Sequence, residues 1–454
     1  MTDQKSTQAT GSVVIPMAII AGLFFIFGFV TWLNGALIPF LQTICDLTAF
    51  EAMLVASAFY AAYTIMALPM AYIIERTGYK NGMALGLFIV AVGALIFIPA
   101  AYGRDFSIFL LAQFVVGSGL TILQTASNPY VVKLGPPESA AVRICIMGLL
   151  NKGAGVVAPV VFTALVLSGI TGVSEAELAA LPEVMRDAKL NELAGQLVSP
   201  YIGMAIALAV LGVAMIFAPI PDIEDEALEG QEDGNIRLSG VFQFPHLVLG
   251  ALALFCYVGV EVIAGDAIGL LGKQAGLDSS MSSMLTSYTM IFMVIGYALG
   301  VVLIPRFISQ QTALMGSAIL GVIFTICVMT GSLQSNVMSA ATLGLFGMPE
   351  IPNAVYFVAL LGFANAMCWP AIWPLALSNL GRYTSKGAAL LIMGIAGGAV
   401  LPPVYGHFAD SGDGQLAYAV SIPAYLYILF YALKGHKMTS WGGKSAAAAA
   451  VEKA

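Results

Sequence analysis

The sequence predicts an all-α membrane protein whose twelve transmembrane helices form two pseudo-symmetric six-helix bundles. The first observation is composition: the 454 residues are 59% hydrophobic and 9% charged, with a mean hydropathy of +0.91. Soluble domains carry about 25% charged residues. The second is that apolar runs of about 20 residues recur along the chain, and each can cross a bilayer as a helix. The third is that segments of the two halves resemble each other at a constant offset.

Polar residues, glycines and prolines divide the chain into the twelve spans. We expect the first span to stay in the mature protein, because no small-residue cleavage site follows it. The spans are 14–44, 50–74, 83–102, 106–134, 141–169, 198–220, 245–271, 279–304, 312–333, 353–380, 387–408 and 415–435.

An acidic stretch after the sixth span indicates a linker between the bundles. The predicted parts are a cytoplasmic N-terminus (1–13), a first bundle (14–220), an acidic cytoplasmic linker (221–244), a second bundle (245–435) and a cytoplasmic tail (436–454). Within the loop 170–197, the stretch SEAELAALPEVMRDAKLNEL predicts a short amphipathic helix at the membrane surface.

Basic residues predict the orientation. With a cytoplasmic N-terminus, thirteen of the 18 lysines and arginines lie in inside segments, four lie outside, and Lys152 lies within a span. This asymmetry follows the positive-inside rule and predicts an inner-membrane protein with both termini in the cytoplasm.

The offset between the halves is 246 residues. NPYVVKLGPPESAAVRICIMG (128–148) parallels WPLALSNLGRYTSKGAALLIMG (373–394), and both Gly135 and Gly148 have a glycine 246 residues later. Weak similarity between six-helix halves is typical of transporters built from parallel repeats.

Polar side chains inside the spans are the candidate substrate contacts. Gln113, Gln124 and Asn128 fall within about 60° of one helix face at 100° per residue. Asn365, Trp369 and Trp373 follow one another at intervals of one turn, and Asn34 lies in the first span. Amides match the donor and acceptor capacity of sugar hydroxyls, and an aromatic plane suits the apolar face of a hexose. The alternatives are amides that only join helices and indoles of an interfacial belt.

Lys152 is the most unusual residue, because it lies in the apolar stretch GLLNKGAGVV. It is about eleven residues from the end of its span, or roughly 16 Å into a core about 30 Å thick. A lone ammonium is costly there, so we expect it to pair with Glu261, or else with Asp266 in the same span. We interpret Lys152, Glu261 and Asp266 as ion-coupling residues whose pairing changes during transport; a fixed structural salt bridge is the alternative.

No cofactor or metal ion is predicted other than a co-transported proton or sodium ion. The histidines form no metal-ligand pattern, and the five cysteines are scattered without CxxC spacing. There is no basic stripe for nucleic acid. The expected partners are a small-molecule sugar and the lipid bilayer, and the expected state is a monomer.

ILQTASNPYVVKLGP, YVGVEVIAGD and AMCWPAIWPLALSNLGRYTSKG resemble the fucose:proton symporter family, which belongs to the major facilitator superfamily. TWLNGALIPF and LNKGAG resemble most closely its N-acetylglucosamine permease and glucose/galactose branches. The resemblance covers nearly the whole chain. It implies ion-coupled uptake of a monosaccharide, a hexose or N-acetylhexosamine, by alternating access, with Asn34, Gln124 and Asn151 as sugar contacts.

Three positions depart from the fucose-type pattern. Gly35 stands where that pattern has an aspartate, Gln124 where it has a glutamate, and Gly148 where it has a glutamine. The usual proton-carrying acids are therefore absent, and Lys152 with Glu261 is the local replacement.

ERTGYKNG (75–82) partly matches the gating loop of the superfamily, with Arg76, Gly78 and Lys80 in place, although any basic inside loop would read similarly. A carboxylated sugar and a drug-efflux antiporter are alternatives within transport, but the fifth span lacks the GP pair of efflux proteins. A polytopic membrane enzyme is disfavoured, because the spans contain no nucleophile–base cluster.

Overall fold

The computed structural model describes residues 14–133, 140–167, 178, 180–220, 238–304 and 306–441. Twelve helices in these ranges are long and apolar enough to cross a membrane. The predicted N-terminus and most of the predicted linker and tail lie outside the described residues, so the predicted boundaries of these parts stay predictions. The loop 170–197 contains a helix as predicted, α6 (Glu183–Gly195), and its location at the membrane surface stays a prediction.

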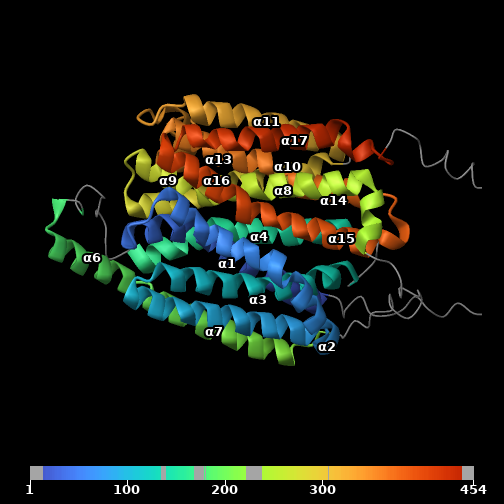
Figure 1. Cartoon of the computed structure of the whole chain (residues 1–454), viewed down its shortest axis with the longest axis horizontal. Coiled ribbons are helices and arrows are strands. Elements are labelled where there is room, and N and C mark those ends of the chain that lie inside the picture. The colour runs from blue at the N-terminus through green and yellow to red at the C-terminus, as the bar shows by residue number, and fades with distance from the viewer. Residues whose placement is uncertain are drawn as a thin grey trace, which may run out of the picture.

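The two halves form two adjoining layers of helices (Figure 1). The first half contains α1 (Val14–Ile44), α2 (Ala49–Gly103), α3 (Phe106–Lys133), α4 (Ala140–Phe162) and α7 (Val198–Phe217). The second half contains α8 (Pro245–Asp266), α9 (Ile268–Gln274), α10 (Ser279–Leu303), α11 (Gln310–Thr330), α12 (Val337–Ala340), α13 (Asn353–Asn365), α14 (Cys368–Leu377), α15 (Thr384–Met393), α16 (Gly397–Ser411) and α17 (Ser421–Leu433).

Within each half, small residues let backbones approach closely. A Cβ on Gly28 of α1 would collide with the backbone of Asn151 on α4, and a Cβ on Gly397 of α16 would collide with the backbone of Phe255 on α8. Asn151 and Gly397 are 246 residues apart, which is the predicted offset. The same contact therefore recurs in both halves, with the glycine on opposite partners.

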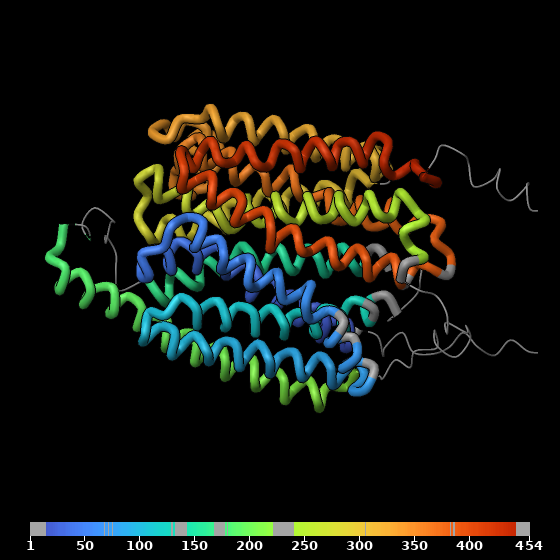
Figure 2. Tube along the Cα trace, viewed as in Figure 1, coloured from blue at the N-terminus to red at the C-terminus, as the bar shows by residue number. Residues whose placement is uncertain are grey.

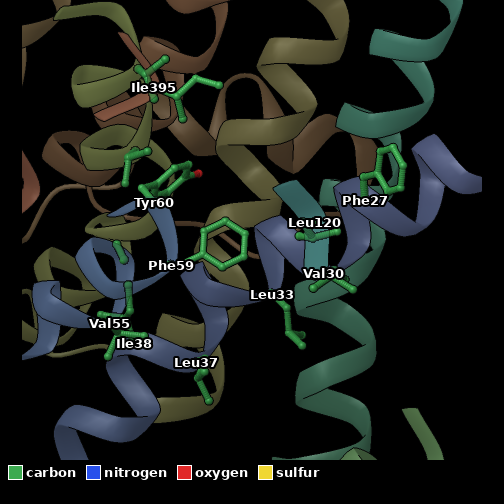
Figure 3. Close-up of a cluster of buried hydrophobic side chains, with 14 of the residues drawn as sticks. Phe27, Val30, Leu33, Leu37, Ile38, Val55, Phe59, Tyr60, Leu120 and Ile395 are labelled. Atoms are coloured by element: carbon green, nitrogen blue, oxygen red, sulfur yellow. The ribbon is translucent and has the colours of Figure 1, made fainter. Parts of the chain in front are cut away.

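The halves meet where α16 lies along α2, and where α10 lies along α4 and α1. Figure 3 shows part of the buried apolar cluster, in which Phe59 and Tyr60 of α2 and Ile395 of the second half are labelled. Tyr60 packs on Gly398, whose added Cβ would lie 2.8 Å from the ring. At this contact a bulky side chain of the first half lies on a glycine of the second.

Figure 2 shows that α1 begins and α17 ends at the same end of the bundle. We call it the basic end, because its flanking residues include Arg76, Lys80, Arg143, Arg306, Lys386 and Lys434. The other end, where α1 ends and α2 begins, we call the opposite end.

The predicted spans agree with the structure in number and differ from it in detail. The predicted spans 50–74 and 83–102 are two membrane-length helices within α2, which meet at the non-helical residue Gly78 (φ 78°). The span 245–271 is interrupted at Ala267, between α8 and α9. The span 353–380 is interrupted after Asn365, and Pro370 lacks the amide hydrogen that could continue the ladder there.

Candidate functional site

The predicted pairing of Lys152 with Glu261 is present in the structure. Lys152 Nζ on α4 lies 2.6 Å from Glu261 Oε1 on α8, and the two side chains are 11% and 10% exposed. Because α4 belongs to the first half and α8 to the second, the pair joins the two halves inside the bundle. A buried ion pair of this geometry offsets the desolvation of each charge, and losing one member leaves the other uncompensated.

Trp32 of α1 completes the surroundings of the ammonium. Lys152 Nζ lies 4.4 Å from the centroid of the indole ring, a cation–π arrangement. The ring fits between two glycines: an added Cβ would lie 2.7 Å from Trp32 Cδ1 at Gly155 and 2.6 Å from Trp32 Cζ3 at Gly265. These glycines belong to different halves, so the indole is held at their junction.

Asp266 lies five residues beyond Glu261, toward the opposite end. It is fully buried, and neither carboxylate oxygen has a hydrogen-bond partner among the described residues. The structure places the two acidic residues near each other and near Lys152. The ammonium is closest to Glu261, so the pairing with Asp266 that the sequence left open is not the one formed.

Two of the predicted substrate contacts are bonded within their own halves. Gln113 Nε2 donates to Asn34 Oδ1 at 2.8 Å, and Tyr425 donates to Asn365 Oδ1 at 3.0 Å. Both asparagines are buried, and their Nδ2 atoms have no partner among the described residues. Each amide therefore joins helices through its oxygen and keeps its donor unused.

The remaining predicted amides are distributed along the first half. Gln124 Nε2 donates to the Tyr63 hydroxyl at 3.0 Å. Asn151 Nδ2 lies 3.5 Å from the Phe24 carbonyl, and Asn128 is exposed near the basic end of α3. Gln113, Gln124 and Asn128 therefore do not share one environment, although they were expected on a common helix face. They lie at different depths along α3, and each has different neighbours there.

Aromatic side chains extend from Glu261 toward the basic end. Tyr257, one turn before Glu261, interacts with that carboxylate, and its ring centroid lies 6.3 Å from that of Trp369. The Trp369 and Trp373 centroids are 5.4 Å apart, and Trp373 Nε1 has no partner among the described residues. An aromatic row next to a charged pair can stack on the apolar face of a sugar ring while its polar groups bind hydroxyls.

The opposite end is closed by direct bonds between the halves. Asp410 of α16 accepts hydrogen bonds from the backbone amides of Ala49 (2.6 Å) and Phe50 (2.8 Å) at the start of α2. Lys273 of α9 donates to Gln42 (3.2 Å) and Thr43 (2.5 Å) at the end of α1. Because these bonds join the two halves, water can reach the buried pair from this end only when the halves separate.

The predicted gating residues lie around the bend of α2. Gly78 adopts φ 78°, and Arg76 is exposed, with its guanidinium carbon 4.2 Å from the centroid of the Tyr72 ring. Lys80 is half-buried. A charge clamp at this loop stays a prediction.

Sequence reasoning did not find Asp410, Lys273 or Tyr63. Asp410 bonds residues that lie 360 positions earlier in the chain, and no local pattern in one sequence indicates such a partner. The sequence does indicate Trp32 as a site residue, because this indole lies two residues before the polar Asn34 inside an apolar span.

Comparison with known proteins supports a transport site. Residues 20–403 match the family described as the Major Facilitator Superfamily. The chain is 35% identical to the glucose/galactose transporter of Brucella abortus, over 91% of this chain and 92% of that one. It is 33% identical to the putative glucose/galactose transporter of Helicobacter pylori, over 96% and 99%. It is 27% identical to the L-fucose-proton symporter of Escherichia coli, over 94% of each.

The fold has matches among solved structures. The fucose:proton symporter of E. coli superposes with a TM-score of 0.68 at 25% identity, covering 93% of this chain and 98% of that one. A bacterial homologue of the lysosomal transporter Spinster, in an inward-facing conformation, gives a TM-score of 0.65 at 15% identity, over 96% and 100%. The second likeness concerns the fold alone.

Proposed function

Since the chain belongs to the major facilitator superfamily, we propose that it takes up a neutral monosaccharide, a hexose or an N-acetylhexosamine, by alternating access in symport with an ion. The observation that carries the proposal is the buried Lys152–Glu261 pair, which joins the two halves at the depth where the aromatic row begins. Relatives named glucose/galactose transporter and L-fucose-proton symporter support a sugar as the substrate and a proton as the ion.

In this mechanism the pair opens and closes as the halves rock. When the halves separate at the level of the pair, the Glu261 carboxylate loses its cation and an ion from solution compensates it. A bound sugar supplies hydroxyls to the unused amide donors of Asn34 and Asn365. The proposed substrate set is Asn34, Gln124, Asn128, Asn151, Lys152, Glu261, Asn365, Trp369 and Trp373.

The charge balance of the site favours a neutral sugar over an acidic one. The Lys152 ammonium already has Glu261 at 2.6 Å and the Trp32 ring at 4.4 Å, and Asp266 lies nearby. A sugar carboxylate would have to displace Glu261 and leave two acidic residues near it. We therefore propose that uronates are poor substrates.

Sugar uptake into proteoliposomes tests the proposal directly. Labelled glucose, galactose, mannose, N-acetylglucosamine and a uronate are each offered with and without a pH or sodium gradient. We expect one or more neutral sugars to exchange across the membrane and to accumulate with a gradient. Transport of apolar cations instead would favour drug efflux, and chemical conversion of the sugar without a gradient would favour an enzyme.

We further propose that the protein works as a monomer in the inner membrane, with both termini in the cytoplasm. Its basic end carries the flanking lysines and arginines, which the positive-inside rule assigns to the cytoplasmic side. The closed opposite end then faces outward, so the structure corresponds to a carrier shut to the outside.

A further inference from the structure

Asp266 has an environment that a carboxylate cannot occupy stably. It is fully buried, and both of its oxygens lack a hydrogen-bond partner among the described residues. A buried charge without a partner costs several kcal/mol, and such groups are found neutral or paired. The inference below rests on the proposed symport and assigns the ion and its site.

Of the charged and titratable groups around Asp266, Lys152 offsets a negative charge there in part, but the carboxylate receives no hydrogen bond from it. Glu261 on the same helix adds a like charge, and Lys152 on α4 is engaged by Glu261 at 2.6 Å. Tyr60 on α2 is the neighbouring group from the other side. Lys273, the next basic residue along the chain, donates to Gln42 and Thr43 of α1.

The uncharged neighbours donate no hydrogen bond to Asp266. On α10, Thr286 donates to the Gly265 carbonyl at 2.7 Å and Thr289 donates to the Ala264 carbonyl at 3.1 Å. On α1, the Trp32 ring lies against Gly265, and its Nε1 has no partner among the described residues. The residues beside Asp266 therefore surround an acid that receives none of their hydrogen bonds.

The remaining influences on Asp266 favour its neutral form. Burial and the like charge of Glu261 outweigh the partial compensation from Lys152. The acid therefore fits this closed state in its neutral, protonated form.

The lining of Asp266 comes from both halves, so it exists only while the opposite end is closed. Trp32 and Tyr60 belong to the first half, and Asp266 belongs to the second. Separation of the halves at this end would remove these side chains and admit water to the carboxyl group.

We propose that Asp266 binds the co-transported proton from the water at the opposite end, and that the sugar-loaded halves can close there only when it is protonated. Closure around sugar with a bare carboxylate, while Lys152 is held by Glu261, would bury an unpaired charge. When the basic end opens, water enters the site and the proton leaves Asp266 for the cytoplasm; Lys152 then compensates the freed carboxylate while the empty carrier returns. Sugar influx is thereby tied to proton influx, with Asp266 carrying the proton and the Lys152–Glu261 pair opening and closing beside it.

The test is Asp266→Asn in proteoliposomes, since an asparagine imitates the neutral acid permanently. We expect sugar counterflow, in which internal unlabelled sugar exchanges for external label, to persist. We expect pH-driven accumulation and sugar-evoked proton uptake to be lost. Wild-type counterflow should fall at alkaline pH, because unprotonated Asp266 blocks closure, and the variant should lose this pH dependence.

Asp413→Asn is the matched control, because Asp413 is an acid at the same end that bonds Gln274 and the Gln415 amide within the second half. It should accumulate sugar as the wild type does. If Asp266→Asn does not fold, Asp266→Ser supplies a second neutral side chain with the same expected outcome.

Accumulation by Asp266→Asn equal to that of the wild type would overturn the inference. So would loss of its counterflow in protein that still binds sugar, and so would wild-type accumulation driven by sodium and indifferent to pH. Absence of sugar counterflow in the wild type would instead contradict the proposed function itself, so the two failures are distinguishable.

Discussion

At the scale of single residues, the free-energy cost of burying Lys152 depends on Glu261, and that of burying Glu261 depends on Lys152. Their Nζ and Oε1 atoms are 2.6 Å apart in a buried setting, and neither residue can lose its partner without leaving a charge in an apolar surrounding. The pair is therefore expected to behave as a unit in measurements of stability, whatever it does in transport.

Glu261→Gln should destabilise the protein by about 3–5 kcal/mol, because it leaves the Lys152 ammonium buried and unpaired. The double variant Lys152→Met with Glu261→Gln should recover most of that loss, since it removes both charges. Thermal unfolding in detergent, followed with and without sugar, measures both. Equal destabilisation by the single and double variants would contradict the paired interpretation.

Glycines beside Lys152 provide a matched steric comparison. A Cβ at Gly155 would lie 2.7 Å from Trp32 Cδ1 and 2.9 Å from Met290 Cγ, whereas a Cβ at Gly153 would meet nothing within 4 Å. Gly155→Ala should cost about 1–3 kcal/mol through overpacking. Gly153→Ala, on the same helix, should be neutral or stabilising by up to about 1 kcal/mol, since alanine favours helix. Thermal unfolding of the two variants separates packing from helix propensity.

At the scale of elements, closure of the opposite end depends on a helix start. The amides of Ala49 and Phe50 begin α2, and the carboxylate that binds them comes from α16 of the other half. A helix N-terminus carries unpaired amides and a partial positive charge, so an external carboxylate is a strong ligand for it. Opening at this end leaves these two amides to water.

Asp410→Ala should favour the open state at this end by about 1–2 kcal/mol, the usual worth of a lost N-cap. Labelling of Ser282→Cys, a buried position at the same end, by an impermeant maleimide should become faster. Burial raises the pKa of the Cys45 thiol to about 11, so this natural cysteine contributes little background near neutral pH. Asp413→Ala, which breaks bonds within one half only, should leave the labelling rate unchanged.

The bend of α2 shows which features of an element a sequence can specify. Two separate spans were predicted around ERTGYKNG, and the structure has two membrane-length helices that meet at Gly78, whose backbone is not helical (φ 78°). Glycine tolerates this backbone conformation, whereas an L side chain is strained in it. Boundaries placed by polar residues therefore located the break between these two helices.

Gly78→Ala should cost about 1–3 kcal/mol, because nothing lies within 4 Å of an added Cβ and the strain is purely in the backbone. Gly22→Ala on α1 also meets nothing within 4 Å and has helical backbone, so it should not destabilise. The difference between their unfolding temperatures measures the cost of placing an L residue in the strained backbone of position 78.

At the scale of the whole molecule, much of the architecture was predictable, because the lipid bilayer restricts which secondary structures an apolar segment can form. Runs of apolar residues must form helices in lipid, which specified twelve spans, and the offset of 246 residues indicated that the two halves repeat one architecture. The pairing of Lys152 with Glu261 was predictable too, because a buried ammonium requires a nearby carboxylate. The partners of Asn34 and Asn365 were not, since a helical face shows which side chains align but not which helix lies opposite.

Orientation of the whole chain makes a separate prediction. A protease-sensitive epitope added after residue 454 should be cleaved in inside-out membrane vesicles and protected in right-side-out vesicles, because the basic end faces the cytoplasm. A tag inserted in the loop between α6 and α7 should show the reverse pattern. Cleavage of both tags from one side would contradict the twelve-span orientation.

α6 packs on α1 and α2 of the first half and projects beyond the bundle (Figure 1). Arg186 pairs with Asp46, and Arg104 lies 3.1 Å from Asp187, while Val184 and Met185 are 83% and 58% exposed. Single-particle images of a small carrier have little mass outside the detergent belt by which to align them. An antibody fragment raised against this arm would supply that mass and, fixed to one half, would report how far this half tilts between states.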